Sequence, residues 1–182
     1  AGFRELLGGK EAMGQWLDEL FTAPSDIEGE EASADITGLI GQYAHGNEPS
    51  HHVAYMYNYT DRPWRTEEVV DSVLYNFYLP EPEGIIGNED CGQMSAWYVM
   101  NALGFYQMAP GEPVYTTGRP VVDEAEIQLS DGVFEIKVHN NSQNHKYVER
   151  VELDGKTLDD RTFRHKDIQP GSVLEFYMTA ER

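Results

Sequence analysis

VVDEAEIQLSDGVFEIKVH, residues 121–139, is the stretch that decides the fold class. Apolar side chains recur there at every second position, most regularly at Phe134, Ile136 and Val138. A period of two places successive side chains on opposite faces of a β-strand, so the stretch predicts strands with one buried face. The pair Asp131-Gly132 between two such runs is typical of a hairpin turn.

More strands are expected further along the chain. The pair Asp154-Gly155 marks a second hairpin turn. Apolar residues lie on both sides of it, namely Val148, Val151 and Leu153 before the turn and Val173, Leu174, Phe176 and Met178 after it. The sequence therefore predicts a β-rich C-terminal region.

The first half of the chain has the period of helices instead. In residues 10–21 the apolar side chains repeat every three or four positions, at Ala12, Met13, Trp16, Leu17, Leu20 and Phe21. We expect further helices at residues 35–44, 49–59, 66–77 and 90–103, with Asp35 and Thr66 as N-caps and Pro49 in a first turn. Helices followed by strands predict an α+β protein, with domains at residues 1–108 and 109–182.

Charge narrows the possible partners. The chain has 13 Lys and Arg against 32 Asp and Glu, a net charge of −19. Such a surface repels the phosphates of nucleic acids and anionic membranes. No stretch has the ~20 apolar residues that a membrane-spanning helix requires. The chain begins without Met, which we interpret as the boundary of a fragment, so the lack of a targeting signal carries little weight.

Two clusters of polar residues lie where loops are expected to lead into helices. They are residues 45–52, HGNEPSHH, and residues 87–95, GNEDCGQMS. A carboxylate at a helix N-terminus is held ionised, which suits a general base, a cation ligand or an acceptor for sugar hydroxyls, and equally suits a plain N-cap. The neighbouring glycines allow close approach to a ligand, and Asn47, Asn88 and Gln93 add amide groups. Both interpretations of Glu48 and Asp90 remain open at this point.

The histidines and the cysteine of the two clusters give weaker indications of function. His51 and His52 are adjacent and would face different sides of a helix, and the sequence has no His-x-x-x-His pair typical of zinc sites. Cys91 is the only cysteine, so no disulfide forms within the chain, and we expect it to be a small buried thiol.

The two clusters closely resemble glycoside hydrolase family 92. The resemblance is carried by GLIGQYAHGNEPSHH at residues 38–52, YMYNY at 55–59, Pro63-Trp64, GNEDCGQMSAWY at 87–98 and LGFY at 103–106. It extends more loosely over nearly the whole chain. It implies the helical part of an (α/α)6 barrel followed by an antiparallel, sandwich-like β region. The activity implied is that of bacterial, calcium-dependent, exo-acting α-mannosidases that invert configuration.

The resemblance also implies roles for single residues. Asp90 matches the general base, and Glu48 matches a residue that contacts the sugar in the leaving-group subsite. Family members often have a second carboxylate at position 88, where this chain has Asn88, so Asp90 is expected to act without an acidic helper there. Members specific for α-1,2 linkages have His at position 47, so Asn47 argues against that specificity.

The remaining expectations concern ligands and location. His51, Asn88 and Glu89 are further candidates for contact with the mannose-containing glycan, and Glu48, Asn88 and Asp90 are candidate ligands of Ca²⁺. Inverting glycosidases hold two carboxyl groups roughly 6.5–9.5 Å apart. The resemblance places the second one, a Glu that acts as general acid, upstream of residue 1. This fragment would then need the remainder of the mannosidase chain, and the family implies a periplasmic or extracellular location.

An alternative interpretation concerns residues 119–182. They could form a carbohydrate-binding β-sandwich, or a purely structural module. The strands show no clear stripe of exposed aromatic residues, which argues against carbohydrate binding.

Overall fold

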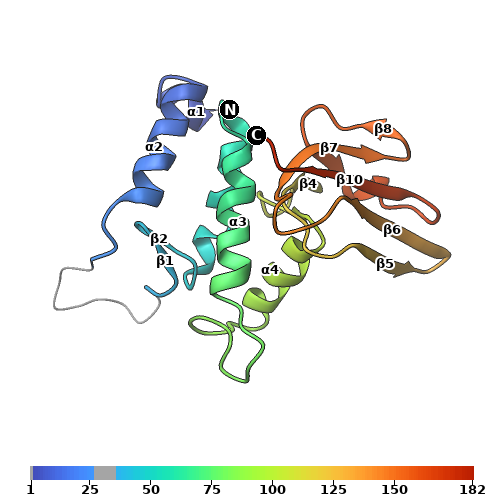
Figure 1. Ribbon diagram of the computed structural model, residues 1–182, viewed down its shortest axis with the longest axis horizontal. Helices are drawn as coiled ribbons and strands as arrows, with labels where there is room; N and C mark the ends of the chain where they lie inside the picture. Colours follow the sequence, from blue (N-terminus) through green and yellow to red (C-terminus); the bar gives the residue numbers. More distant parts are fainter. Residues whose placement is uncertain (1, 27–35) are drawn as a thin grey trace. The chain divides into compact units, whose positions relative to one another are not determined.

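The computed structural model in Figure 1 describes residues 2–26 and 36–182. The chain forms two compact units, Ala1–Tyr98 and Val99–Arg182. The first is mainly helical and the second is built on β-sheets, which confirms the α+β class. The (α/α)6 barrel and the domain division at residue 108 remain predictions. In the described part of the chain, no helix has the length and apolar character needed to cross a membrane.

The helices of the first unit begin with α1 (Gly2–Leu6) and α2 (Lys10–Thr22). The helix expected at residues 10–21 is therefore confirmed. Met13, Leu17 and Phe21 are buried on one face of α2, as the four-residue spacing predicts. Trp16 is 39% exposed, and its ring lies 5.4 Å from that of Phe3 in α1.

Asp18 of α2 ties this helix to the segment that leads into α3 (Trp64–Asn76). Its carboxylate accepts a 2.8 Å hydrogen bond from the Tyr57 hydroxyl and pairs with Arg62 and Arg65. The helix expected at residues 66–77 exists, but it begins at Trp64, and Thr66 is not its N-cap. The Thr66 side chain is buried and donates to the Ala54 carbonyl instead.

The helix expected at residues 35–44 is wrong over its described part. A short hairpin of β1 (Leu39–Ile40) and β2 (Tyr43–Ala44) replaces it. The reason is the pair Gly38 and Gly41, both with positive φ, at 63° and 61°. A chain in this left-handed region leaves the α-helical path, and glycine does so without a steric penalty. Asp35, the expected N-cap, lies outside the described residues.

The segment expected to be a helix at residues 49–59 forms two 3₁₀ stretches, Glu48–Ser50 and Val53–Tyr59. The Ser50 hydroxyl lies 2.7 Å from the carbonyl oxygens of both Ala44 and Asn47. Side-chain bonds of this kind compete with the hydrogen-bond pattern of an α-helix. The last helix, α4 (Gln93–Ala102), begins three residues later than expected.

The second unit contains two sheets. Strands β5 (Glu124–Leu129), β6 (Gly132–His139), β10 (Val173–Thr179), β7 (Tyr147–Leu153) and β8 (Lys156–Thr157) form one sheet in that order. Strand β10 lies between a parallel partner, β6, and an antiparallel one, β7. The second sheet comprises β3 (Phe105–Tyr106), β4 (Val114–Thr117) and β9 (Thr162–Arg164).

Alternation along these strands agrees with the prediction. Phe134, Ile136 and Val138 are buried, and they join Val148, Val151, Leu174, Phe176 and Met178 in one core. The Asp154-Gly155 turn joins β7 to β8, with φ of 52° and 74° at its two residues. The other hairpin turns one residue earlier than expected, because Gly132 already pairs with Leu129.

Candidate active site

The first of the two polar loops, residues 45–52, follows the β1–β2 hairpin. The backbone N–H groups of His45 and Gly46 donate hydrogen bonds to the carbonyl oxygens of Gly38 and Thr37, respectively. The start of the loop therefore lies against the residues just before β1. The loop then turns into the 3₁₀ stretch that begins with Glu48. Asn47 is exposed and Glu48 is half-buried. The Glu48 oxygen Oε1 is buried and has no hydrogen-bond partner among the residues that the structure describes. A buried carboxylate oxygen in this state is expected to take a ligand.

The second loop carries Asp90 and lies against the first. Gly87 has a φ of 78°, and a Cβ there would lie 2.8 Å from Thr37 Oγ1 and 3.4 Å from the Cα of Gly46. A side chain at this position would collide with the Thr37 hydroxyl and would be strained at this φ, so glycine favours this approach of the two loops. Asp90, Cys91 and Gly92 follow with φ of 47°, 57° and 89°. Two successive non-glycine residues in the left-handed region are costly, by about 1–2 kcal/mol each, and such outliers cluster at functional sites.

The Glu89 side chain, unlike that of its neighbour Asp90, is hydrogen-bonded to the first turn of α4. Its carboxylate accepts hydrogen bonds from the Ser95 amide at 3.0 Å and from the Ser95 hydroxyl at 2.9 Å. Glu89 thereby satisfies a free N–H in the first turn of α4, where the helix dipole also favours a negative charge. The capping role considered for Asp90 is thus filled by Glu89, and the sugar contact expected of Glu89 stays a prediction.

The carboxyl groups of Glu48 and Asp90 lie within hydrogen-bonding reach of each other. This hydrogen bond, with some burial and the charge of Glu48, raises the pKa of Asp90 above its usual range. Two carboxylates at this distance repel each other unless a proton, a cation or a ligand hydroxyl lies between them. The two loops therefore form one site, whose chemistry favours a positively charged or hydrogen-bond-donating ligand.

The spacing of this pair excludes one assignment. An inverting glycosidase needs a gap of roughly 6.5–9.5 Å between its acid and its base, because a water molecule and the sugar lie between them. Two carboxyl groups in direct contact leave no such gap. Glu48 therefore does not fit the role of proton donor opposite Asp90.

The predicted metal ligands are only partly brought together. Glu48 and Asp90 meet, and Asn88 is exposed on the same loop as Asp90. Among residues 2–26 and 36–182, no group of three or more His, Cys, Asp or Glu side chains has the arrangement of a metal site. Calcium takes six to eight oxygen ligands in proteins. The side-chain oxygens of Glu48, Asn88 and Asp90 are the type of ligand that calcium prefers. These three residues supply only part of the six to eight ligands.

The histidine of this cluster, His51, is only 1% exposed. Its Nε2 lies 3.0 Å from the His45 carbonyl oxygen, and its Nδ1 lies 3.2 Å from the side-chain nitrogen of Gln93. Both ring nitrogens are thus bonded within the protein. The direct sugar contact expected of His51 from the sequence has no free ring nitrogen to make it.

Sequence reasoning also missed the importance of His45 and misplaced Cys91. His45 is fully buried, and burial with the nearby His51 lowers its pKa to about 3. Its ring lies 4.4 Å from that of Trp97 and 4.6 Å from that of His51. Nothing in a single sequence marks such a histidine, because its partners are up to 52 positions away. Cys91, expected to be buried, is exposed and lies in the left-handed turn.

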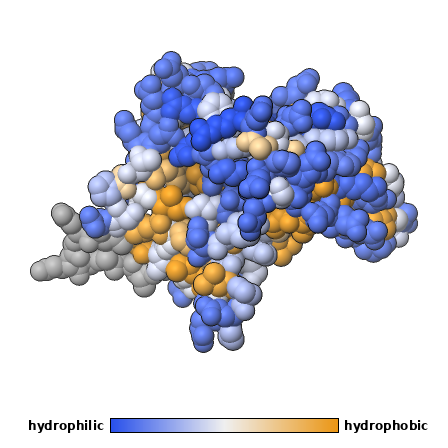
Figure 2. Space-filling view, in the orientation of Figure 1, coloured by the Kyte–Doolittle hydropathy of each residue, from blue (hydrophilic) through white to orange (hydrophobic). Residues whose placement is uncertain are grey.

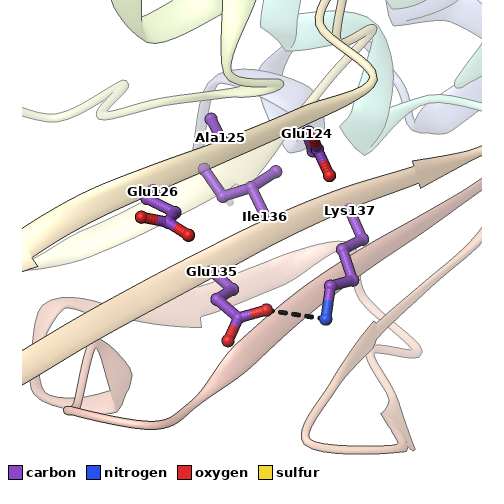
Figure 3. Close-up of a pocket in the computed structure, with 6 residues that line it drawn as sticks. All are labelled: Glu124, Ala125, Glu126, Glu135, Ile136 and Lys137. Carbon is purple, nitrogen blue, oxygen red and sulfur yellow. Dashed lines mark ion pairs between the residues drawn. The ribbon is translucent and has the colours of Figure 1, made fainter.

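The β-sheet unit has a shallow hollow between β5 and β6, shown in Figure 3. Its lining includes Glu124, Glu126 and Glu135 and no aromatic residue, and Lys137 is paired with Glu135 at 2.6 Å. The ring of Tyr177 on β10 lies against its two cross-strand neighbours, with His139 at 4.5 Å and the Arg150 guanidinium at 3.4 Å. Sugar-binding surfaces use open aromatic rings, so neither feature supports the carbohydrate-binding alternative.

The comparisons with known proteins point to one family. A model of the catalytic domain of glycosyl hydrolase family 92 matches residues 1–180. An α-mannosidase of this family from Bacteroides thetaiotaomicron is 39% identical, with a TM-score of 0.83 over 95% of this chain and 23% of its own. The same enzyme has also been solved in complex with mannoimidazole.

Two further proteins are similar over less of their sequence or at lower identity. A second family 92 mannosidase of Bacteroides thetaiotaomicron, described as inverting, is 32% identical, with a TM-score of 0.81 over 99% of this chain and 26% of its own. An uncharacterized secreted glycosidase of Arthroderma benhamiae is 26% identical over 75% of this chain and 18% of its own length. The chain thus spans about a quarter or less of these relatives.

Proposed function

Because the chain belongs to glycoside hydrolase family 92, we propose that it is the part of an exo-acting α-mannosidase that supplies the water-activating base. The observation that supports this most directly is that the carboxyl groups of Glu48 and Asp90 meet where the two polar loops come together. The solved mannosidases support mannose-containing glycans as the substrate class.

Asp90 is the proposed general base. Its carboxylate is exposed, so water can reach it, and Glu48 raises its pKa towards the range in which a base works best near neutral pH. Asp90 takes a proton from the water that attacks the anomeric carbon, on the face opposite the leaving group. The result is inversion of configuration at that carbon.

The general acid is proposed to lie in the remainder of the enzyme. Glu48 stands too close to Asp90 for that role, as argued above, and it instead receives sugar hydroxyls in the leaving-group subsite. Its buried, unpartnered Oε1 is suited to accept such a hydroxyl. The exposed amides of Asn47 and Asn88 add donors and acceptors for further hydroxyls.

Calcium is proposed as the cofactor, held in part by Glu48, Asn88 and Asp90. When bound, the ion would neutralise the two facing carboxylates and polarise mannose hydroxyls. Other ligands of the shell would come from the substrate, from water or from the rest of the enzyme.

We also propose that the 182 residues alone do not hydrolyse mannosides and need the remainder of the chain. Large apolar side chains reach the surface in the first unit, including Leu6 at 86% and Leu79 at 48% exposure, and orange residues are visible on the face shown in Figure 2. Exposed apolar side chains of this size are compatible with contact to a further part of the enzyme. The secreted relative supports an extracellular or periplasmic location.

The test of this function is Asp90→Asn in the complete enzyme. The amide keeps the shape of the side chain but cannot take up the proton, so kcat should fall by about 10²–10⁴-fold on an α-mannoside. The control is Glu83→Gln, which changes the same charge at an exposed position of the loop before Gly84. Proton NMR of the first sugar released should show β-mannose. A kcat for Asp90→Asn equal to that of the control would remove Asp90 from the role of base.

A further inference from the structure

A chain of hydrogen bonds between side chains lies beneath the two carboxylate loops. The Tyr78 hydroxyl donates to the Met94 carbonyl at 3.1 Å, which uses its one proton. The Tyr78 oxygen must therefore accept from His45 Nε2, 2.8 Å away. His45 Nδ1 is then free of hydrogen and accepts from the Tyr43 hydroxyl at 2.9 Å. The ring of His45 is thus held neutral and in one tautomer.

The same reasoning assigns the tautomer of His51. The His45 carbonyl can only accept, so His51 Nε2 carries a hydrogen and donates to it at 3.0 Å. His51 Nδ1 is then an acceptor, and the side-chain amide of Gln93 donates to it at 3.2 Å. This last bond joins the two loops, because His51 lies three residues after Glu48 and Gln93 lies three residues after Asp90.

The neighbouring side chains restrict how the rings of His45 and His51 can move. His51 is stacked on His45 at 4.6 Å, and its carbonyl accepts from the Trp97 indole at 3.2 Å. Burial lowers the pKa of both histidines, which keeps Nδ1 of His51 available as an acceptor. Asp90, by contrast, is exposed in a left-handed turn, and its carbonyl oxygen accepts a 3.2 Å hydrogen bond from the backbone N–H of Gln93. Gln93 is thus bonded both to the Asp90 backbone and to His51 of the other loop.

We propose that His51 and Gln93 are positioning residues, whose hydrogen bond sets the placement of Asp90 relative to Glu48. The proposal rests on the proposed function, because the placement matters only if Asp90 is the base. Neither residue touches the sugar. They act through the loops, and a displacement of about 1 Å at a reacting group can cost on the order of 10²-fold in rate.

Three variants of the complete enzyme test the proposal. Gln93→Leu removes the donor at similar volume. His51→Gln places an amide near the former Nε2, so it keeps the bond to the His45 carbonyl and loses the one to Gln93. His51→Asn places its amide near the former Nδ1, so it keeps the bond to Gln93 and leaves the buried His45 carbonyl without its partner.

These variants separate positioning from stability. Gln93→Leu and His51→Gln should lower kcat by about 10²-fold with little change in KM, since the base is misplaced while sugar binding persists. The double variant should lose no more than either single one, because both break the same bond. His51→Asn should keep most of the rate, although its Tm falls furthest because a buried carbonyl is left unpaired.

If His51 and Gln93 have a purely structural role, kcat should fall in the same order as Tm. His51→Asn, the least stable variant, should then have the lowest kcat. That order, or a normal kcat in Gln93→Leu, would overturn the proposal while leaving Asp90 as the base. An unmutated complete enzyme without mannosidase activity would instead overturn the proposed function and this inference together.

Discussion

At the scale of single residues, burial decides the behaviour of His45 more than its neighbours in sequence do. An unperturbed histidine titrates near pH 6.5, whereas burial and the nearby His51 lower the pKa of His45 to about 3. The pKa of His51 is lowered as well, again mainly by burial. The network needs both rings neutral, so proton uptake by either ring opposes the folded state.

The sign of the pH dependence follows from these shifts. Between pH 6.5 and about 3 the unfolded chain binds a proton at His45 that the folded chain does not. Stability should therefore fall as the pH falls, by about 2 kcal/mol between pH 6.5 and 5 for His45 alone. Urea unfolding of the chain at several pH values measures this loss, and His45→Gln should reduce it.

His165→Gln provides the control for the pH experiment. His165 is an exposed histidine of the second unit, so this variant shows what the loss of a histidine outside the His45 network does to the curve. An unfolding free energy of the unmutated chain that stays level from pH 7 to 5 would contradict a neutral, buried His45.

At the scale of elements, glycines decide where helices give way to other structure. The alternating run at residues 121–139 could be assigned to strands because a period of two leaves few alternatives. Helix α2 could likewise be assigned from its pattern, because its apolar residues repeat every four positions. The helix predicted from Asp35 as an N-cap is wrong over residues 36–44, because Gly38 and Gly41 take the positive φ values of the β1–β2 hairpin.

The hairpin glycine Gly41 gives a prediction at this scale. A Cβ there would meet backbone atoms of Leu20 and Phe21, including the Phe21 oxygen at 2.8 Å, in addition to the strain of φ +61°. Backbone cannot move aside as a flexible side chain can. Gly41→Ala should therefore destabilise the chain by roughly 3 kcal/mol, measured by urea unfolding.

Gly111→Ala separates conformational strain from collision. Gly111 also has a positive φ, of 88°, but a Cβ there would meet no atom of residues 2–26 or 36–182 within 4 Å. This variant should lose only about 1 kcal/mol, the cost of the left-handed conformation itself. Equal losses in the two variants would show that the contact with α2 does not matter.

At the scale of the whole molecule, the candidate site shows the limits of a sequence. The two polar loops could be located from their residues, and their resemblance to family 92 supplied the roles. Their contact could not be derived, since Glu48 and Asp90 are 42 positions apart in the sequence. The capping by Glu89 and the burial of His51 likewise depend on the tertiary fold.

The proposed mechanism requires a proton donor outside these 182 residues, which leads to a prediction for the isolated chain. A base without a proton donor across the bond leaves the glycosidic oxygen unprotonated, and Glu48 lies too close to Asp90 to be that donor. The purified chain should show no hydrolysis of an aryl α-mannoside above background, with or without calcium. The complete enzyme, assayed beside it, should be active.

Adding the missing part as a separate polypeptide makes the experiment decisive. The exposed apolar side chains of the first unit offer a surface on which that part can associate. Mixing the two should restore activity, and a mixture made with the Asp90→Asn chain should remain inactive. If the unmutated 182 residues alone hydrolyse the mannoside in a calcium-dependent manner, both carboxyl groups of the mechanism must lie within them, and the assignment of the acid to the rest of the enzyme fails.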